Sequence, residues 1–157
     1  MKHRLVHSGL VTVILCVAGI LPVQARAAQC SLGSVAGTWA YTYTGTVFVP
    51  NPLPVAAVGQ AQLDTQGNLK GTQTHTLAGQ TEVEDTSGTY TVDKNCTGTF
   101  AVSVYLNGQL VRTANLNVAY DSNTNHARMI FTSLTLPDGT VLPAVITADV
   151  TRVLANN

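Results

Sequence analysis

The stretch SGTYTVDKNCTGTF, from Ser87 to Phe100, decides the fold class of this chain. Strand-forming residues alternate along it, a polar turn and Cys96 follow, and a second strand begins directly afterwards. Alternation of this kind is typical of a half-buried β-strand, and a short polar connection is typical of an antiparallel pair. The stretch therefore predicts a β-hairpin.

The same pattern continues from Gly37 to Val153, and no segment keeps apolar residues at helical spacing over three turns. The sequence therefore predicts an all-β domain in which neighbouring strands run antiparallel. Asn107-Gly108 supports this, because the pair is typical of a tight type I′ turn. Eight strands are expected, over residues 37–49, 55–64, 69–77, 87–93, 97–106, 109–121, 126–136 and 140–153.

Two segments between these strands are less regular. The run Pro50-Asn51-Pro52-Leu53-Pro54 contains three residues that cannot donate ladder hydrogen bonds, so we expect it to separate the first strand from the second. Residues 78–85 are compatible with a loop over one end or with additional strand. They contain the acidic cluster Glu82, Glu84 and Asp85, a composition typical of a solvated loop.

The N-terminus has the pattern of a secretory signal peptide. Lys2 and Arg4 precede a 12-residue apolar run over residues 10–21, and Ala25-Arg26-Ala27 supplies small residues for cleavage. The run is shorter than the roughly 18 residues that cross a bilayer, so we expect no membrane span in the mature chain. The sequence predicts a signal peptide over residues 1–27, one domain over residues 28–157, and export to the periplasm or the extracellular space.

Two cysteines remain after cleavage, because Cys16 is removed with the apolar run. An even number of cysteines in an exported chain indicates a disulfide, here between Cys30 and Cys96. It should tie the N-terminus to the middle of the sheet. No further Cys or His stands at metal-ligand spacing, so we predict neither a metal site nor a cofactor.

The charge of the mature chain argues against nucleic acid as a partner. Cleavage removes three of the eight basic residues and none of the eight acidic ones, which leaves a net charge near −3. No basic stripe remains to neutralise phosphates or anionic lipids. The oligomeric state is left open.

The chain resembles bacterial exported proteins of the allene oxide cyclase barrel-like family over residues 36–153. The resemblance rests on GTYTVDKNCTGT at residues 88–99, on GTWAY at 37–41, and on VGQAQLD with QGNLKG at 58–64 and 66–71. It implies a single closed eight-stranded antiparallel β-barrel of the allene oxide cyclase or lipocalin type. In some relatives the lumen binds a small apolar molecule and guides cyclisation or isomerisation. No catalytic residue is carried over.

In a closed barrel of eight strands, alternate residues face an interior that is either filled or large enough for one small ligand. Trp39, Tyr41 and Tyr43 alternate along the first strand and form one aromatic face. Such a face packs a core or lines a pocket, and rings with polar tips suit a ligand site.

Polar residues also interrupt the apolar faces of other strands. Arg112 should extend into water from a strand end, pair with a carboxylate such as Glu82 or Glu84, or reach a ligand. Gln73 and His75 share a face with Leu69 and Leu77. His75 is either a hydrogen-bonded interior residue or a general acid or base. Arg152, at the end of the last strand, is expected to be solvated.

Three functions fit these observations. The first is binding of a small, largely apolar molecule in the lumen, with Trp39, Tyr41, Tyr43, Gln73, His75 and Arg112 as candidate lumen residues. The second is a cyclase or isomerase that uses the same cavity, which needs positioning more than acid-base groups. The third is a structural or adhesive domain with a filled core. The sequence leaves open whether the chain is an enzyme.

Overall fold

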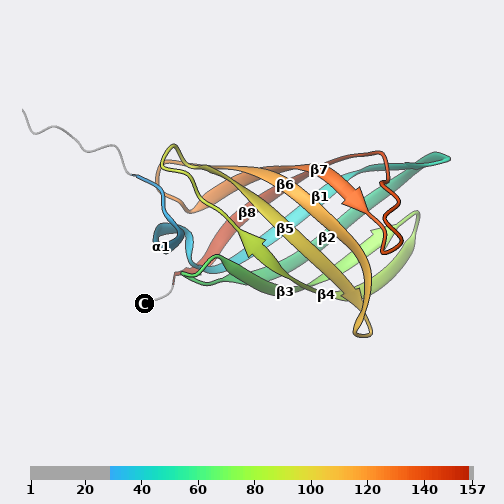
Figure 1. Ribbon diagram of the computed structural model, residues 1–157, viewed down its shortest axis with the longest axis horizontal. Coiled ribbons are helices and arrows are strands. Elements are labelled where there is room, and N and C mark those ends of the chain that lie inside the picture. The colour runs from blue at the N-terminus through green and yellow to red at the C-terminus, as the bar shows by residue number, and fades with distance from the viewer. Residues whose placement is uncertain (1–28, 156–157) are drawn as a thin grey trace, which may run out of the picture.

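The computed structural model describes residues 29–155, which form a closed antiparallel β-barrel (Figure 1). This confirms the predicted all-β fold class. The predicted signal peptide, with Cys16, lies outside the described residues. The elements are α1 (Leu32–Val35), β1 (Gly37–Val49), β2 (Asn51–Leu63), β3 (Asn68–Leu77), β4 (Gln80–Tyr90), β5 (Thr97–Leu106), β6 (Gln109–Tyr120), β7 (His126–Thr135) and β8 (Ala144–Ala155).

Each strand pairs with the next in the sequence, and β1 closes the barrel by pairing with β8 as well as β2. Closure removes the exposed strand edges that an open sheet leaves. Because side chains alternate across a strand, every second residue faces the lumen, as Trp39, Tyr43 and Val47 do on β1. The hydrophobic core is therefore the barrel interior.

A single helical turn, α1, closes the end of the barrel at which β1 begins (Figure 1). Ser31 caps it, with reciprocal side-chain contacts between Ser31 and Ser34. Val35 is fully buried, and its carbonyl accepts a hydrogen bond of 2.8 Å from the indole Nε1 of Trp39. We call α1, which includes Val35, together with Trp39 and Arg152 the plug.

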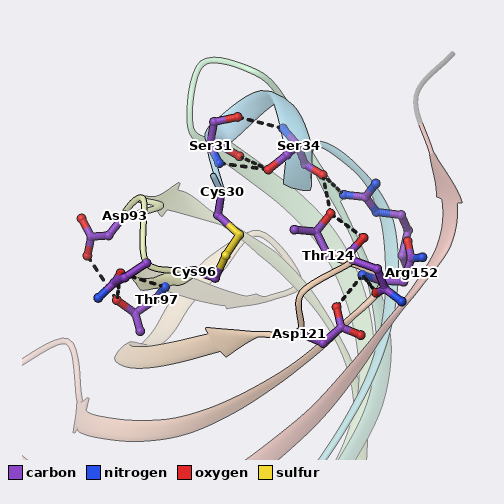
Figure 2. The surroundings of a disulfide bond; sticks show 12 residues. Cys30, Ser31, Ser34, Asp93, Cys96, Thr97, Asp121, Thr124 and Arg152 are labelled. Atoms are coloured by element: carbon purple, nitrogen blue, oxygen red, sulfur yellow. Dashed lines mark hydrogen bonds between the residues drawn. A yellow bond between two sulfur atoms is a disulfide. The ribbon is translucent and has the colours of Figure 1, made fainter. Parts of the chain in front are cut away.

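A disulfide between Cys30 and Cys96 holds the plug to the barrel (Figure 2). Their Cα atoms lie 5.0 Å apart across a sequence separation of 66 residues. Cys96 lies in the turn between β4 and β5, so the bond reaches the end of the barrel. The expected attachment to the middle of the sheet was wrong. The disulfide fixes the entry of the chain into β1 beside that turn.

The hairpin turns follow the predicted chemistry. Asn107 and Gly108 connect β5 to β6 with φ values of 52° and 79°. Two consecutive positive φ angles are what a type I′ turn requires, and its twist matches that of the flanking strands. The expected turn is confirmed.

The expected start of the second strand was wrong. Pro52 and Pro54 lie inside β2 and pair with Phe48 and Thr46. The carbonyl of Pro54 accepts from the backbone N–H of Ala78, on the β3 side, so its nitrogen faces that side too, where β3 ends at Leu77. No ladder donor is needed there, and the prolines are tolerated.

The acidic segment, which the sequence left open as a loop or additional strand, is strand. From Gln80 onward it belongs to β4, which pairs with β3 from Gln80 to Thr89. Alternation is preserved there, since Glu84 and Thr86 are buried while Val83 and Asp85 are exposed.

Within residues 29–155, no helix is long and apolar enough to cross a membrane.

Candidate functional site: the barrel lumen

The lumen contains a cavity of about 100 Å³. Its wall is mostly apolar and aromatic, with polar groups gathered toward the end away from α1. The lining residues are Trp39, Tyr41, Tyr43, Ala61, Leu63, Leu69, Gln73, Thr86, Phe100, Val102, Val104, Arg112, Ala114, Leu116, Tyr120, Met129, Phe131, Ala148 and Val150.

Tyr41 reaches across the inner surface of β2 to contact β3. Its hydroxyl donates a hydrogen bond of 3.0 Å to Oε1 of Gln73. The crossing is possible because Gly59 lies opposite both residues in the ladders, and a Cβ there would stand 2.7 Å from the Tyr41 hydroxyl oxygen. Glycine at 59 therefore makes room for the Tyr41 ring.

Gln73 links Tyr41 to Glu84 by hydrogen bonds. Its amide nitrogen donates to Oε2 of Glu84 at 2.7 Å and to the hydroxyl of Tyr43 at 3.4 Å. Gln73 and Glu84 are directly opposite in the β3–β4 ladder, which brings both side chains into the lumen. Gln73 is 5% exposed and Glu84 1%.

Arg112 forms a bidentate ion pair with Glu84. Nη1 donates to Oε1 at 2.7 Å and Nη2 donates to Oε2 at 2.5 Å. The guanidinium fork matches the carboxylate geometry, which makes this arrangement among the stronger charge-assisted contacts in proteins. The Arg112 side chain is only 15% exposed, so its extension into water was the wrong expectation. The pairing with Glu84 was the correct one.

Electrostatics keep both members of the pair ionised. Burial alone would raise the pKa of Glu84, but hydrogen bonds from Arg112 and Gln73 and the nearby positive charge outweigh it and lower that pKa. Burial opposes the charge of Arg112 as well, yet the contacts with Glu84 raise its pKa. Glu84 and Arg112 therefore form an ion pair with no net charge.

His75 and Tyr43 complete a set that we call the rim cluster: Tyr41, Tyr43, Gln73, His75, Glu84 and Arg112. Nδ1 of His75 lies 3.6 Å from Oε1 of Glu84, and its ring lies 6.2 Å from that of Tyr43. Burial, followed by the charge of Arg112, lowers the pKa of His75. His75 is therefore a neutral neighbour of the ion pair at pH 7.

The plugged end of the cavity is almost wholly apolar. Trp39 and Tyr120 meet edge to face with ring centroids 6.0 Å apart. The Tyr120 hydroxyl is buried and has no hydrogen-bond partner among the described residues. Burial also raises the pKa of Tyr120, so its proton stays in place. Nε of Arg152, in the plug, is likewise buried without a partner among the described residues, so this end combines aromatic walls with two unsatisfied donors, of which only Tyr120 lines the cavity.

The candidate lumen residues named from the sequence do not all occupy equivalent places. Trp39, Tyr41, Tyr43, Gln73 and Arg112 line the cavity. His75 is 8% exposed and lies 3.6 Å from Glu84, but it is not part of the cavity wall. Their role in binding stays a prediction.

Several wall residues were missed. Thr86 was hidden by the acidic composition of its segment, although strand alternation could have placed it. Glu84, named only as a possible partner of Arg112, faces inward beside the wall without lining the cavity. Met129 and Phe131 share the inward parity of β7, but a β-bulge shifts the β6–β7 register between Asn115 and Leu116 and sends Leu134 inward instead of an odd-numbered residue. Sequence alternation gives no sign of where such a bulge falls.

The chemistry available to the rim cluster is limited. Glu84 has a lowered pKa and accepts from both Arg112 and Gln73, which makes it a poor proton acceptor. Among the residues that the structure describes, no three His, Cys, Asp or Glu side chains gather in a way that could hold a metal ion. The arrangement favours hydrogen bonding and shape recognition.

Fold and cavity together define the class: a closed eight-stranded antiparallel barrel with a small internal lumen. No protein-family model matches the chain, and no curated protein matches it. The resemblance to the allene oxide cyclase barrel-like family therefore stays a prediction.

Solved structures do match. A redesigned β-barrel, mFAP1, bound to DFHBI, is 18% identical, with 78% of this chain and 98% of that chain covered at a TM-score of 0.51. The S-type phycobiliprotein lyase CPES from Guillardia theta is 6% identical, with coverage of 80% and 92% at 0.44. Rv2717c from M. tuberculosis is 14% identical, with 77% and 94% at 0.40. At these identities the likeness concerns the fold alone.

Proposed function

We propose that this protein binds a small, largely apolar molecule in its barrel lumen. The observation that carries the proposal is the cavity itself, an aromatic and aliphatic space with polar groups concentrated toward one end. Ligand sites generally have this composition, because apolar walls supply affinity and a few fixed polar groups supply orientation. A filled core, which the structural or adhesive reading requires, fits less well.

The size of the cavity limits the ligand. Drug-sized ligands occupy pockets of roughly 300–1,000 Å³, and an engineered dry cavity of about 150 Å³ holds benzene. A cavity of about 100 Å³ suits a single small ring or a short chain. The redesigned barrel mFAP1, which shares this fold, is bound to a small molecule, DFHBI, and this supports the same use of the lumen here.

Export is part of the proposal. The signal-peptide pattern over residues 1–27 supports it, and so does the Cys30–Cys96 bond, because disulfides persist in oxidising compartments such as the periplasm and the extracellular space. The family resemblance supports the same location.

Binding is a better fit than catalysis. A cyclase or isomerase using this cavity would rely on positioning, since the carboxylate of Glu84 is saturated by Arg112 and Gln73 and His75 lies off the wall. Positioning is also what a binding protein supplies. We therefore place the cyclase or isomerase reading second.

The test is calorimetric titration of the purified protein with cyclopentanone, a neutral ring with one carbonyl. We expect saturable binding. Ala114→Leu fills the cavity from the inner face of β6 and should weaken binding by about tenfold or more, because the added carbons occupy the ligand's volume.

The matched control is Ala119→Leu, the same change on the exposed face of the same strand, which should bind as the wild type does. Native mass spectrometry of the purified protein would reveal a co-purified ligand directly. Absence of saturable binding, or equal affinity in Ala114→Leu and wild type, would contradict the proposal.

A further inference from the structure

Arg112, the one arginine in the cavity wall among the described residues, is already neutralised from within the barrel. An arginine in an apolar lumen would ordinarily indicate an anionic ligand, such as a carboxylate. Here Glu84 occupies both arms of the Arg112 guanidinium and is itself 1% exposed. The cation that would attract an anionic ligand is committed to a residue of the chain.

The carboxylate is equally committed. Its two oxygens accept from Arg112 and from the amide of Gln73, and His75 stands 3.6 Å from one of them. His75 adds no positive charge, since its pKa is lowered by burial and by Arg112. The rim cluster therefore presents no net charge to the cavity at neutral pH.

A charged occupant would find no free counter-ion in the cavity wall, because Arg112 is committed to Glu84 and Arg152, in the plug, is not among the lining residues. An anion would have to displace Glu84 from Arg112 and leave that carboxylate buried and unpaired, while a cation would have to displace Arg112 from Glu84. Burying an unpaired charge in an apolar site is strongly unfavourable and can cancel the whole affinity of a small ligand. Both signs of charge are disfavoured.

Two phenolic protons remain free to recognise the ligand. The Tyr43 hydroxyl accepts from Gln73, and no acceptor for its own proton occurs among residues 29–155. The Tyr120 hydroxyl has no partner there at all, although the residue is only 8% exposed and belongs to the cavity wall. Buried donors of this kind normally find an acceptor. One lies toward each end of the cavity.

We propose that the lumen selects an uncharged ligand that carries a hydrogen-bond acceptor, such as a ketone, aldehyde, ether or ester oxygen, and rejects carboxylates and amines. This inference rests on the proposed function and narrows its ligand class. The neutral Glu84–Arg112 pair sets the charge rule, and the tyrosine hydroxyls supply the polar contact.

Three probes of similar size separate the possibilities: cyclopentanone, cyclobutanecarboxylate and cyclopentylammonium, titrated calorimetrically at pH 7. The ketone should bind at least about tenfold more tightly than either ion, because only the ions leave a buried charge uncompensated. A carboxylate or an ammonium ion that binds as tightly as the ketone overturns the inference but leaves lumen binding intact. If none of the three binds, the proposed function fails first.

The variant Glu84→Gln tests the cause. It frees the guanidinium of Arg112 while nearly preserving shape, so the carboxylate probe should gain about tenfold or more and become the preferred ligand. An unchanged preference in a folded Glu84→Gln protein would show that the ion pair does not set the charge rule.

The double variant Glu84→Gln with Arg112→Met covers the case in which the single change prevents folding. It removes both charges together, so neither ion should gain relative to the ketone. A gain by either ion relative to the ketone in the folded double variant overturns the inference.

Discussion

Arg112 and Arg152 lie toward opposite ends of the lumen and are held in different ways. Arg112 is in the rim cluster and meets a carboxylate in a bidentate contact. Arg152 is in the plug, where its guanidinium carbon lies 5.0 Å from the centroid of the Trp39 ring. Its Nη2 donates to the backbone carbonyl of Ser34 in α1 (Figure 2).

The difference shows what each end of the barrel does. An aromatic face and a carbonyl stabilise a cation only in part, and no carboxylate ion pair to Arg152 occurs among the described residues. Its role is to join β8 to α1 and cover Trp39. The rim cluster, by contrast, cancels its own charge and borders the cavity. The plug end closes the barrel, and the rim end lines the cavity with a polar cluster of no net charge.

The largest difference between the two ends is expected when Arg112 is replaced. Arg112→Met leaves Glu84 buried without its cation, and loss of one partner of a buried ion pair typically costs about 3–5 kcal/mol. We expect a decrease of that size in the free energy of unfolding, measured by urea denaturation with Trp39 fluorescence. Trp39 is the chain's only tryptophan, so the signal has one source.

The control is Arg128→Met, the same replacement at an exposed arginine on the neighbouring strand β7, which should change stability by no more than about 0.5 kcal/mol. Adding Glu84→Gln to Arg112→Met should recover most of the loss. A single variant as stable as the control would mean that the ion pair is not a buried structural unit.

Much of the fold could be predicted from the sequence. Strand alternation and turn residues were enough to give eight antiparallel strands, and β1 and β5 have the predicted bounds. The rest was missed where local composition conflicts with tertiary context. Prolines suit β2 because its neighbour β3 ends beside them, and acidic residues suit β4 because Glu84 meets a cation from β6.

Only part of the candidate site could be predicted from the sequence, for a related reason. Inward parity places Tyr43, Gln73 and Arg112 on lumen faces, which one strand's sequence can show. The partner of Arg112 lies 28 positions earlier in the chain, and the sequence offered Glu82 and Glu84 equally. Both carboxylates share a face of β4, with Glu84 opposite Gln73 and Glu82 opposite His75, so position along the strand decides between them: Glu84 is buried, while Glu82, nearer the start of β4, is exposed. Arg152 was wrongly expected in solvent, because only the closed barrel brings α1 above it.

A smaller effect is expected at the plug. Arg152→Met removes the contact with Trp39 and the hydrogen bond to Ser34, while the hydroxyl of Thr124 still donates to the same carbonyl at 3.1 Å. We expect a loss of about 1–2 kcal/mol in urea denaturation and a change in the emission of Trp39. Arg128→Met again serves as the control. A loss as large as that of Arg112→Met would show that both arginines are equally structural.

The smallest effect concerns pH and separates His75 from Glu84. The folded protein holds the pKa of His75 below its ordinary value of 6.5, mainly through burial and then through the charge of Arg112. The unfolded chain therefore takes up a proton first as the pH falls, and stability that is present above pH 6.5 is lost as the pH drops through the lowered value. The pKa of Glu84 is also lowered, from 4.5, so its contribution is lost only in more acidic solution.

Urea denaturation between pH 7.5 and pH 5.5 should thus show a modest decline in the free energy of unfolding for the wild type, within about 1 kcal/mol. His75→Asn should flatten that decline, whereas His126→Asn, which changes a half-buried histidine paired with Asp149 on the outer face, should keep it. The slope isolates the rim cluster, because the plug contains no histidine among the described residues. An equal slope in wild type and His75→Asn would mean that His75 is solvated and does not belong to the neutral cluster on which the proposed ligand selection rests.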